Sequence, residues 1–517
     1  MWSLLATSIF GTVAIFLFKR VRAWRVEAAD IAFGRAKGCE PPPKLPYAWP
    51  LALDLIVNAF KAARSGHILQ FFERAVAPVG HTFEQVLLGV SGIDTFDPQN
   101  IEAVLSSQFK EFGLGARRAT FYPLLGDGIF TQDGSAWKHS RDLLRPQFLG
   151  NRAQNYTQMQ EAVDKLIALI PDGQPVDLQP LFFRFTLETT TFLLFGKSIG
   201  ALDDRYETGV AGKESEFAQA FTVSQDYLAE RGRLGDLYWL IGGPKFWRAC
   251  RTVHHFVDSM VQSRIGVKES VDSKYVFIDA LLEETQDVFT IRSQVLNILL
   301  AGRDTTACCL TWTLRLLSRD QGVLSKLRAE IQDTIGSSPP TQQDLKRMPY
   351  LNYVLKEVLR LYPSVPVNSR TALTTTTLPT GGGKDRKSPI LIRKGAAVGY
   401  CPYIMHRRKD LYGEDAYEFK PERWSEGFEK RIGWGYLPFN GGPRICLGQD
   451  FALLEASYAI VRLLQIFPSI NPCAPPQPGK TEGQQTLRSK EIPGTERQHL
   501  TLVLSCAEGC WTRLKKQ

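Results

Sequence analysis

The sequence predicts a mainly α-helical protein with a small β-sheet portion, preceded by one N-terminal transmembrane helix. Apolar residues recur at helical spacing through most of the chain after Leu51. Strand-like segments are concentrated after Pro363, and the first 18 residues contain no charged side chain. Because 44% of the 517 residues are hydrophobic and 22% are charged, the chain can build a large core, and a disordered protein is excluded.

The segment from Met1 to Phe18 would span about 27 Å as a helix, which is just enough to cross a bilayer. It is followed at once by four basic residues, Lys19, Arg20, Arg22 and Arg25. Positive charge at this end favours a cytosolic location for the rest of the chain. We therefore expect residues 1–18 to be a signal anchor in the endoplasmic reticulum membrane. A cleaved signal peptide and an interfacial helix that does not span are the alternatives.

Residues 19–50 are expected to form a basic and proline-rich linker, since the prolines between Pro41 and Pro50 stiffen an extended chain. No repeat or long low-complexity segment follows, so residues 51–517 are expected to form one domain. The net charge of +9 includes the four basic residues beside the predicted anchor, and the remainder does not indicate nucleic-acid binding. Nine thinly spread cysteines favour a reducing compartment over a disulfide scaffold.

Apolar periodicity places helices in the body of the chain and strands near its later part. The predicted helices cover Ala162–Ile170, Leu181–Phe195, Phe277–Glu284, Thr290–Leu317 and Leu351–Leu361. The predicted strands cover Val365–Thr371 and Ile390–Ile392, on either side of a turn-rich stretch. Its run from Gly381 to Lys384 lacks the spacing of a phosphate-binding loop and indicates a hairpin. Neither a Rossmann fingerprint nor a flavin domain is visible, so reducing power must come from elsewhere.

The segment Phe439-Asn440-Gly441-Gly442-Pro443-Arg444-Ile445-Cys446-Leu447-Gly448 is the most informative in the chain. A glycine-rich loop presents one cysteine at the start of a predicted helix, where backbone N–H groups stabilise a thiolate. A lone thiolate in a sheltered pocket suits an axial haem ligand, whereas a structural cysteine in a turn is the alternative. The segment resembles the cysteine loop of the cytochrome P-450 superfamily of haem-thiolate monooxygenases. The resemblance implies the P-450 fold and haem b, with Cys446 on the iron and Phe439 beside the haem.

The segment Ala301-Gly302-Arg303-Asp304-Thr305-Thr306 lies within a long apolar helix, where a buried acid and alcohol need a reason. It matches the family helix that crosses over the haem. The resemblance implies that Asp304 and Thr305 relay protons and that Gly302 leaves room for dioxygen. The alternative is that the threonines bond to carbonyls one turn back and that Gly302 serves packing.

Glu357 and Arg360 are three residues apart and face the same way on their predicted helix. They match the family's Glu-x-x-Arg motif, and Arg423 matches the arginine that joins it. The resemblance implies a structural role for the three residues: a charged network that holds the cysteine loop in place.

Haem carries two carboxylates that need cationic partners when they are buried. Trp137 and Arg141 match the family's Trp-x-x-x-Arg helix, which reaches a haem propionate. Arg444 and Arg370 match two further propionate-binding positions, although Arg370 also fits an ordinary strand arginine.

The resemblance implies a monooxygenase that receives electrons from a membrane-anchored NADPH–cytochrome P-450 reductase and acts on a hydrophobic small molecule. Basic groups such as Lys430 and Arg431 would face the acidic surface of that reductase. A haem-thiolate isomerase or dehydratase without a reductase and a non-enzymatic haem sensor are the competing functions. The Asp304–Thr305 pair favours the monooxygenase, because a peroxide-using enzyme has less need of proton relay.

Three segments resemble the fungal branch that hydroxylates alkanes and fatty acids. They are Arg360–Arg370, the hairpin Thr374–Pro389 and the cysteine loop. This resemblance implies terminal hydroxylation of long apolar chains. A tailoring oxidase of a fungal polyketide or terpenoid pathway remains the alternative, because function depends on the pocket and not on the fold. Arg117 and Arg118 are either an anchor for a fatty-acid carboxylate or an exposed loop pair.

Overall fold

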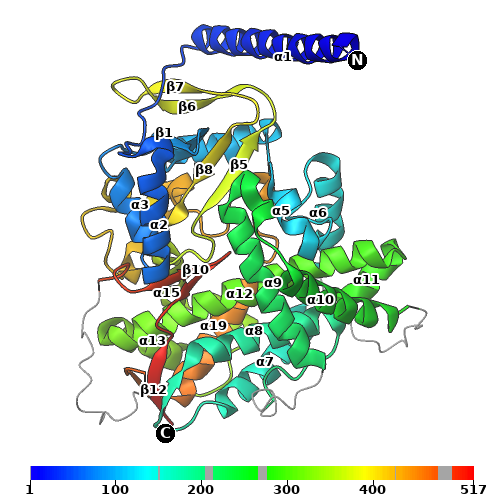
Figure 1. The fold of residues 1–517 in the computed structure, drawn as a ribbon. Helices are drawn as coiled ribbons and strands as arrows, with labels where there is room; N and C mark the ends of the chain where they lie inside the picture. The colour runs from blue at the N-terminus through cyan, green and yellow to red at the C-terminus, as the bar shows by residue number, and fades with distance from the viewer. Residues whose placement is uncertain are drawn as a thin grey trace. The chain divides into compact units, whose positions relative to one another are not determined.

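The computed structural model describes residues 2–149, 152–203, 213–265, 276–425, 427–475 and 492–516 (Figure 1). The chain divides into two compact units. The strand-rich unit comprises Met1–Leu55, Ala75–Gly115 and Ser369–Tyr400. The helical unit comprises Ile56–Arg74, Ala116–Asn368 and Cys401–Gln517.

The strand-rich unit is built on a five-stranded sheet in the order β1-β2-β8-β5-β3. Its strands are β1 (Thr82–Leu87), β2 (Val90–Thr95), β3 (Phe112–Gly113), β5 (Asn368–Ala372) and β8 (Ala397–Tyr400). β1 and β2 are antiparallel, with Thr82 opposite Thr95, and β2 runs parallel to β8. A two-residue turn of Leu88 and Gly89, both at positive φ, joins β1 to β2, as the twist of a tight hairpin requires.

The glycine-rich stretch forms a hairpin, as predicted. β6 (Thr376–Gly382) pairs antiparallel with β7 (Ser388–Ile392), and the register is irregular between Leu378 and Gly382. Gly381 has a φ of 113°, and a Cβ atom there would lie 2.7 Å from the Cβ atom of Thr82. Only glycine fits this position without displacing its neighbours.

Helix α1 (Trp2–Ala36) begins in the predicted anchor and continues well beyond Phe18. Among the described residues, no helix is both long and apolar enough to cross a membrane. The proline-rich segment follows α1 and lies along the hairpin, where the N–H of Glu40 donates to the carbonyl of Pro389 at 2.9 Å. The first half of the predicted linker is thus helical, and the second half is extended.

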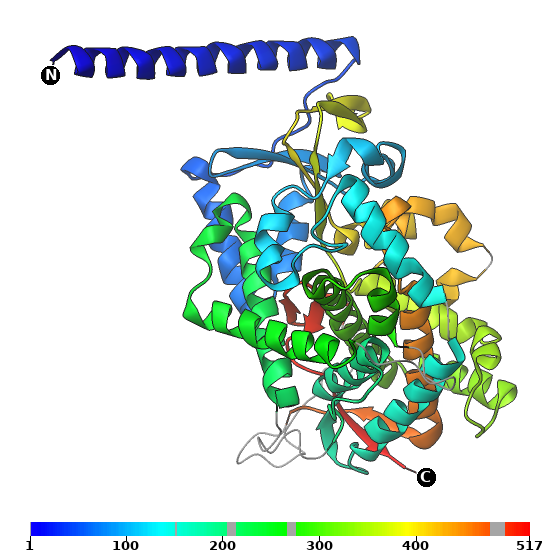
Figure 2. The same ribbon diagram turned by 90° about the vertical axis from the view of Figure 1, so that its right-hand side faces the viewer.

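The helical unit is organised around α12 (Val288–Arg319), which runs through its interior (Figures 1 and 2). Asp287 caps this helix by accepting hydrogen bonds from the N–H groups of Phe289 and Thr290. α12 packs against several other helices, including α8 (Leu178–Phe195), α10 (Pro244–Gln262), α15 (Pro349–Leu361) and α19 (Gln449–Ile466). The long apolar stretch of the sequence is therefore a buried helix of the core.

The five predicted helices are all present. α11 (Phe277–Glu284) has the predicted bounds, and α8, α12 and α15 extend beyond them. α7 (Arg152–Ala168) begins well before the predicted Ala162 and ends before the predicted Ile170. Local signals set both ends of α8. Asp177 caps its first turn, and Gly196 ends it in the left-handed conformation. α15 ends at Leu361, shortly before Pro363.

The remaining elements complete the two units or lead from one to the other. The further helices are α2 (Leu53–Ser65), α3 (Ile68–Val76), α4 (Pro98–Glu102), α5 (Arg117–Leu125), α6 (Gly134–Leu149), α9 (Lys213–Arg233), α13 (Gln321–Thr334), α14 (Gln342–Lys346), α16 (Pro402–Met405), α17 (Lys409–Tyr412) and α18 (Phe428–Ile432). In the helical unit, β4 (Pro175–Asp177), β12 (Trp511–Lys515) and β9 (Ser469–Pro472) form one small sheet, and β10 (Gln498–Leu500) and β11 (Leu504–Cys506) form another.

Candidate functional site around Cys446

Cys446 lies at the end of a tight loop that leads into α19. The N–H of Cys446 donates to the carbonyl of Phe439 at 3.0 Å, which closes the loop on itself. Gly442 takes a positive φ of 64°, and a Cβ atom on Gly441 would lie 2.3 Å from the ring of Trp434. Two of the glycines are thus required by backbone conformation and close packing.

The Cys446 thiol is accessible to solvent, yet protein surrounds most of it. This burial raises the pKa of the thiol, while the N–H of Gly448 and the positive charge of Arg141 pull it down. A positively charged ligand on the accessible side would complete the stabilisation of the thiolate. The donor set is therefore suited to a haem iron, which takes one thiolate on one face.

Trp137, Arg141 and Arg444 come together beside the cysteine loop. The guanidinium carbon of Arg444 lies 4.5 Å from the centre of the Trp137 ring, and that of Arg141 lies 5.8 Å from it. Arg444 also donates to Asp133 Oδ1 at 2.6 Å and to the carbonyl of Gln132 at 2.9 Å. Two cationic groups and an indole thus lie together near Cys446, as expected for residues that hold haem propionates.

Arg370 belongs to β5 in the strand-rich unit and is buried there. It donates to the carbonyl of Ser369 at 2.8 Å, and its guanidinium lies 5.9 Å from the centre of the Tyr400 ring. Its assignment to a propionate stays a prediction.

The acid and alcohol predicted to relay protons lie in the middle of α12. Thr305 Oγ1 donates to the carbonyl of Ala301 at 2.6 Å. Asp304 is buried, with its Oδ1 3.6 Å from Nε of Arg303. Burial raises the pKa of the Asp304 carboxyl, while Arg303 and the side chain of Gln225 oppose the rise. Both groups have the partners that such a buried position demands, including the one-turn bond that the alternative interpretation describes.

Neighbouring elements form hydrogen bonds to the backbone of α12 beside Asp304. Thr186 on α8 donates to the carbonyl of Arg303 at 2.5 Å, and Ser364 donates to that of Thr305 at 3.0 Å. A Cβ atom on Gly302 would lie 2.7 Å from Oγ1 of Thr190. Gly302 therefore has a packing role, whatever space it leaves elsewhere.

Glu455 is a buried acid that the sequence reasoning missed. It lies on α19, where it accepts a hydrogen bond from Thr189 and interacts with Thr306, the residue after the predicted relay. Burial raises its pKa to about 8, although both threonines oppose the rise. The signal was an acid at a core position of an apolar helix, which is as unusual as Asp304 on α12.

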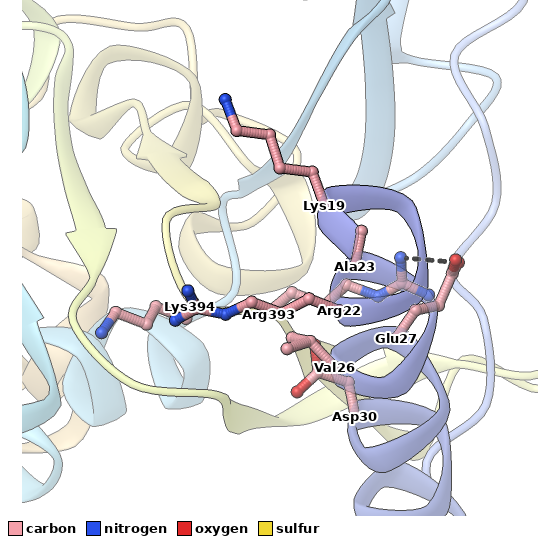
Figure 3. Close-up of a pocket in the computed structure, with 8 residues that line it drawn as sticks. All are labelled: Lys19, Arg22, Ala23, Val26, Glu27, Asp30, Arg393 and Lys394. Carbon is pink, nitrogen blue, oxygen red and sulfur yellow. Dashed lines mark hydrogen bonds and ion pairs between the residues drawn. The ribbon is translucent and has the colours of Figure 1, made fainter. Parts of the chain in front are cut away.

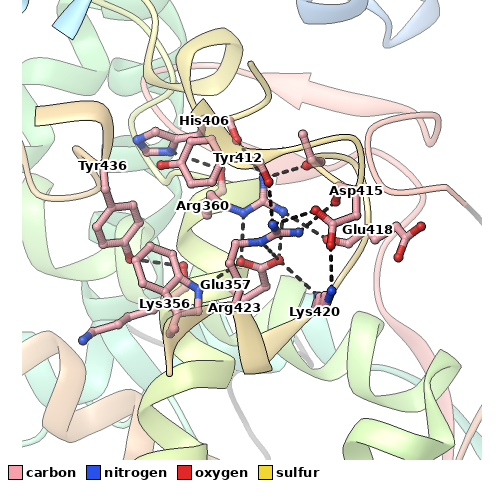
Figure 4. Close-up of polar contacts among 12 residues, drawn as sticks. Lys356, Glu357, Arg360, His406, Tyr412, Asp415, Glu418, Lys420, Arg423 and Tyr436 are labelled. Carbon is pink, nitrogen blue, oxygen red and sulfur yellow. Dashed lines mark hydrogen bonds and ion pairs between the residues drawn. The ribbon is translucent and has the colours of Figure 1, made fainter. Parts of the chain in front are cut away.

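The Glu-x-x-Arg pair forms the centre of a buried network (Figure 4). Arg360 holds both carboxylate oxygens of Glu357 at 2.8 Å, and neither side chain is exposed. Arg423 approaches Glu357 to 3.4 Å, and Trp424 Nε1 donates to it at 2.9 Å. The three charged residues thus lie in one network, and its role in holding the cysteine loop stays a prediction.

His406 connects this network to the cysteine loop. Arg360 donates to the carbonyl of His406 at 2.7 Å, and Nδ1 of His406 lies 3.1 Å from the carbonyl of Arg360. The N–H of Leu437, just before the cysteine loop, donates to Nε2 of His406 at 2.8 Å. Burial and the positive charge of Arg360 lower the pKa of His406 to about 3, so the ring is neutral and can accept this bond.

Arg117 and Arg118 begin α5 and do not form a loop pair. Arg117 donates to Oδ1 of Asn368 at 2.6 Å, whereas Arg118 pairs with Asp127 through two bonds of 2.9 and 3.0 Å. Arg118 is thus already neutralised by a carboxylate of the chain itself.

Comparisons with known proteins show the family to which this chain belongs. The family model described as Cytochrome P450 matches residues 43–491. The chain is 53% identical to "Cytochrome P450" of Arthroderma benhamiae over 97% of both chains. It is 42% identical to "Cytochrome P450 monooxygenase g430" of Fusarium sp over 90% of this chain and 84% of the relative. It is 45% identical to "Cytochrome P450 52A5" of Candida maltosa over 79% of this chain and 81% of the relative.

The fold also resembles solved structures. The crystal structure of the cytochrome P450DA heme domain matches with a TM-score of 0.74 at 22% identity, covering 93% of this chain and 98% of the other. Cys446 lies on a closed glycine loop, and hydrogen bonds through His406 connect the segment before that loop to the Glu-x-x-Arg network. Because the family model also matches most of its length, the chain belongs to the cytochrome P450 family.

Proposed function

We propose that this enzyme inserts one oxygen atom from O2 into a C–H bond of a long-chain fatty acid or alkane, by hydroxylation at the end of the chain. Cytochrome P450 enzymes are monooxygenases, a class of oxidoreductases, and use haem iron as their cofactor. The observation that carries the proposal is the accessible Cys446 sulfur, presented by a rigid loop beside Arg141 and Arg444.

Haem, when bound, supplies the iron at which O2 is activated. Cys446 would hold that iron, and Phe439 would lie beside the haem. Trp137, Arg141 and Arg444 would hold its propionates, since each arginine offers a fork of N–H donors to a carboxylate. The same chemistry supports the proposal that Arg370 binds a propionate.

Asp304 and Thr305 are the groups that we propose to move protons. Asp304 is a buried acid whose pKa is raised by its surroundings, so it holds a proton more firmly than a surface carboxylate and is better suited to carry one. The hydroxyl of Thr305 follows it on the same helix and can pass a proton on from its Oγ1. The Arg303 side chain keeps Asp304 from becoming an isolated buried charge.

The substrate class rests on two lines of support. The segments Arg360–Arg370 and Thr374–Pro389 and the cysteine loop resemble the fungal alkane- and fatty-acid-hydroxylating branch. The chain is also 43 to 46% identical to several P450 52A proteins of the yeasts Candida maltosa and Debaryomyces hansenii. A tailoring oxidase of a polyketide or terpenoid pathway is the alternative, because one fold serves many substrates.

The proposal includes a membrane location and a redox partner. We infer that residues 1–18 anchor the enzyme in the endoplasmic reticulum, with its catalytic part in the cytosol. Electrons would come from NADPH through a membrane-anchored cytochrome P450 reductase. A substrate that partitions into the bilayer suits an enzyme held at its surface.

The test is product analysis with the full-length enzyme, its reductase and NADPH. Dodecanoic acid, a long alkane and a panel of polyketides and terpenoids are supplied, and products are identified by mass spectrometry. We expect NADPH-dependent ω-hydroxydodecanoic acid or the corresponding alkanol. Oxidation of only a polyketide or terpenoid would replace the substrate assignment. Turnover of a peroxide without reductase would indicate an isomerase, and the absence of any turnover by a haem-loaded enzyme would indicate a sensor.

A further inference from the structure

A cavity of about 480 Å³ lies between α1 and the turn that joins β7 to β8, entirely within the strand-rich unit (Figure 3). Its charged lining comes from two elements far apart in the sequence. These residues are Lys19, Arg22, Glu27 and Asp30 on α1, and Arg393 and Lys394 on the turn. The proposed reaction uses none of them.

The two sides of the cavity are held together by specific contacts. Arg393 Nη1 donates to Glu27 Oε1 at 3.1 Å. The hydroxyl of Thr375 donates to Asp30 Oδ1 at 2.8 Å and accepts the N–H of Lys394 at 3.2 Å. A Cβ atom on Gly34 would lie 3.2 Å from the side chain of Leu391 on β7, so the helix and the strand are closely packed. The basic residues of the turn are thereby placed opposite those of the helix.

The cavity has an excess of positive charge. Four of the charged lining residues are basic and two are acidic. Both acids are engaged within the unit, Glu27 by Arg393 and Asp30 by the hydroxyl of Thr375. Within the described ranges, Lys19, Arg22 and Lys394 make no ion pair with the protein. Three cations are therefore available to one anionic group of a ligand.

An apolar surface adjoins these cations. Ile15, Phe16, Leu17 and Phe18, directly before Lys19 on α1, are between 55 and 68% exposed. Trp24, further along α1, is 68% exposed, and tryptophan favours the boundary between headgroups and acyl chains. A ligand with an anionic head and an apolar tail would contact both the cationic cavity and the apolar surface beside it. A free inorganic anion would contact only the cationic cavity.

We propose that this cavity binds the phosphate of an anionic phospholipid, with the acyl chains along Ile15–Phe18. The inference rests on the membrane location proposed above. Arg22 offers a planar fork of donors to a phosphate, and Lys19 and Lys394 add two point charges. A lipid bound in this way touches both α1 and the β7–β8 turn, so it fixes how the strand-rich unit meets the bilayer.

The test uses the full-length, haem-loaded enzyme in detergent, titrated calorimetrically with short-chain phosphatidic acid, short-chain phosphatidylcholine and inorganic phosphate. We expect saturable binding of phosphatidic acid that is at least about 10-fold tighter than that of the other two. The double variant Arg22→Gln/Lys394→Gln should weaken it about 10-fold. The control Arg20→Gln/Arg25→Gln also removes two positive charges, but at residues of α1 that do not line the cavity. It should change the affinity for phosphatidic acid less than about two-fold.

Three results would overturn the proposal: equal weakening by both double variants, equal affinity for inorganic phosphate and phosphatidic acid, or no saturable binding. Turnover of dodecanoic acid and cosedimentation with phosphatidylcholine vesicles are measured on the same preparations. Neither depends on Arg22 or Lys394 in our account. A failure of the lipid site would leave both measurements unchanged, whereas a failure of the proposed activity or of the anchor would appear in the unaltered enzyme.

Discussion

At Cys446, opposing influences act on a single thiol. Burial disfavours the thiolate, while the N–H of Gly448 and the charge of Arg141 favour it. The loop that carries the sulfur is closed by the bond from the Cys446 N–H to the carbonyl of Phe439, and within it the side chain of Asn440 donates to the carbonyl of Arg444 at 3.3 Å. The protein thus supplies a ligand that gains most of its stabilisation when a metal cation binds.

Thr305 tests the proposed proton delivery. We expect Thr305→Val to lower the rate of product formation by about 100-fold, since the hydroxyl is the group that passes the proton. NADPH oxidation should continue and yield hydrogen peroxide instead of product. The ratio of product to NADPH, measured with purified reductase, checks this. Thr305→Ser keeps the hydroxyl and should keep most of this ratio, and an unchanged ratio in Thr305→Val would contradict the assigned role.

Glu455 should make stability fall with rising pH. Its pKa is about 8 in the folded protein against an ordinary value of 4.5, so the folded state holds a proton that the unfolded state has already lost. This contribution is complete below about pH 4.5, decreases between pH 4.5 and 8, and then levels off. Glu455→Gln should remove it, giving a smaller loss of stability between pH 6 and 8 than the unaltered enzyme shows.

Urea midpoints at pH 6, 7 and 8 measure this difference. Glu414→Gln, whose side chain is 88% exposed, is the control and should keep the slope of the unaltered enzyme. Identical slopes for Glu455→Gln and the unaltered enzyme would show that Glu455 is ionised in the folded state.

At the scale of elements, the Glu357–Arg360 pair joins α15 to the segment before the cysteine loop through His406. Removal of Arg360 takes away two 2.8 Å bonds to the buried Glu357 carboxylate and leaves it the longer contact with Arg423 at 3.4 Å. We therefore expect Arg360→Ala to cost about 3–5 kcal/mol and to prevent haem incorporation. Lys356→Ala, on the same helix but paired at the surface with Glu429, should cost less than about 1 kcal/mol.

The double variant Glu357→Leu/Arg360→Met separates the loss of the ion pair from the burial of a charge without its partner. It removes both charges, so it should unfold at a higher temperature than Arg360→Ala. Thermal unfolding and haem content per polypeptide are the measurements. Equal destabilisation by Lys356→Ala and Arg360→Ala would refute the role of the network.

Much of this element-level arrangement could be predicted from the sequence. α11 was predicted at its observed bounds, and α12 was predicted as a buried helix, because their apolar spacing matches a helical period. β5 begins at Asn368, later than the predicted Val365, since Pro363 and Pro366 cannot donate to a ladder. Glu455 was missed because its partners Thr189 and Thr306 lie on other helices and share no sequence pattern with it.

The contacts of the predicted site residues could not be predicted from the sequence. The sequence pattern could bring Trp137 and Arg444 to one place, but not the stacking of the guanidinium on the indole or the bond from Arg444 to Asp133. Such contacts depend on tertiary packing between α6 and the cysteine loop. For the same reason, the roles of Arg370, Phe439, Asp304 and Thr305 toward haem and oxygen stay predictions.

At the scale of the whole molecule, the enzyme depends on an external source of electrons. Lys430 and Arg431 are exposed on α18, which precedes the cysteine loop in the chain. If they meet an acidic surface of the reductase, Lys430→Glu/Arg431→Glu should raise the apparent KM for reductase about 10-fold, more so at low salt. Turnover driven by an organic hydroperoxide, which bypasses the reductase, should not change.

Lys515→Glu/Lys516→Glu is the matched control, because it reverses two adjacent exposed charges at the end of the chain. It should leave the KM for reductase within two-fold of the unaltered value. An equal rise in both double variants would show a general effect of net charge and not a docking site.

The central claim is that Cys446 holds the haem iron as a thiolate. The direct measurement is the carbon monoxide difference spectrum of the reduced enzyme, compared between the unaltered protein, Cys446→Ala and the control Cys473→Ala, which changes a half-buried cysteine elsewhere in the helical unit. We expect the red-shifted Soret band of a thiolate-ligated haem for the unaltered protein and for Cys473→Ala, and its loss in Cys446→Ala. The same band in purified Cys446→Ala would contradict the account.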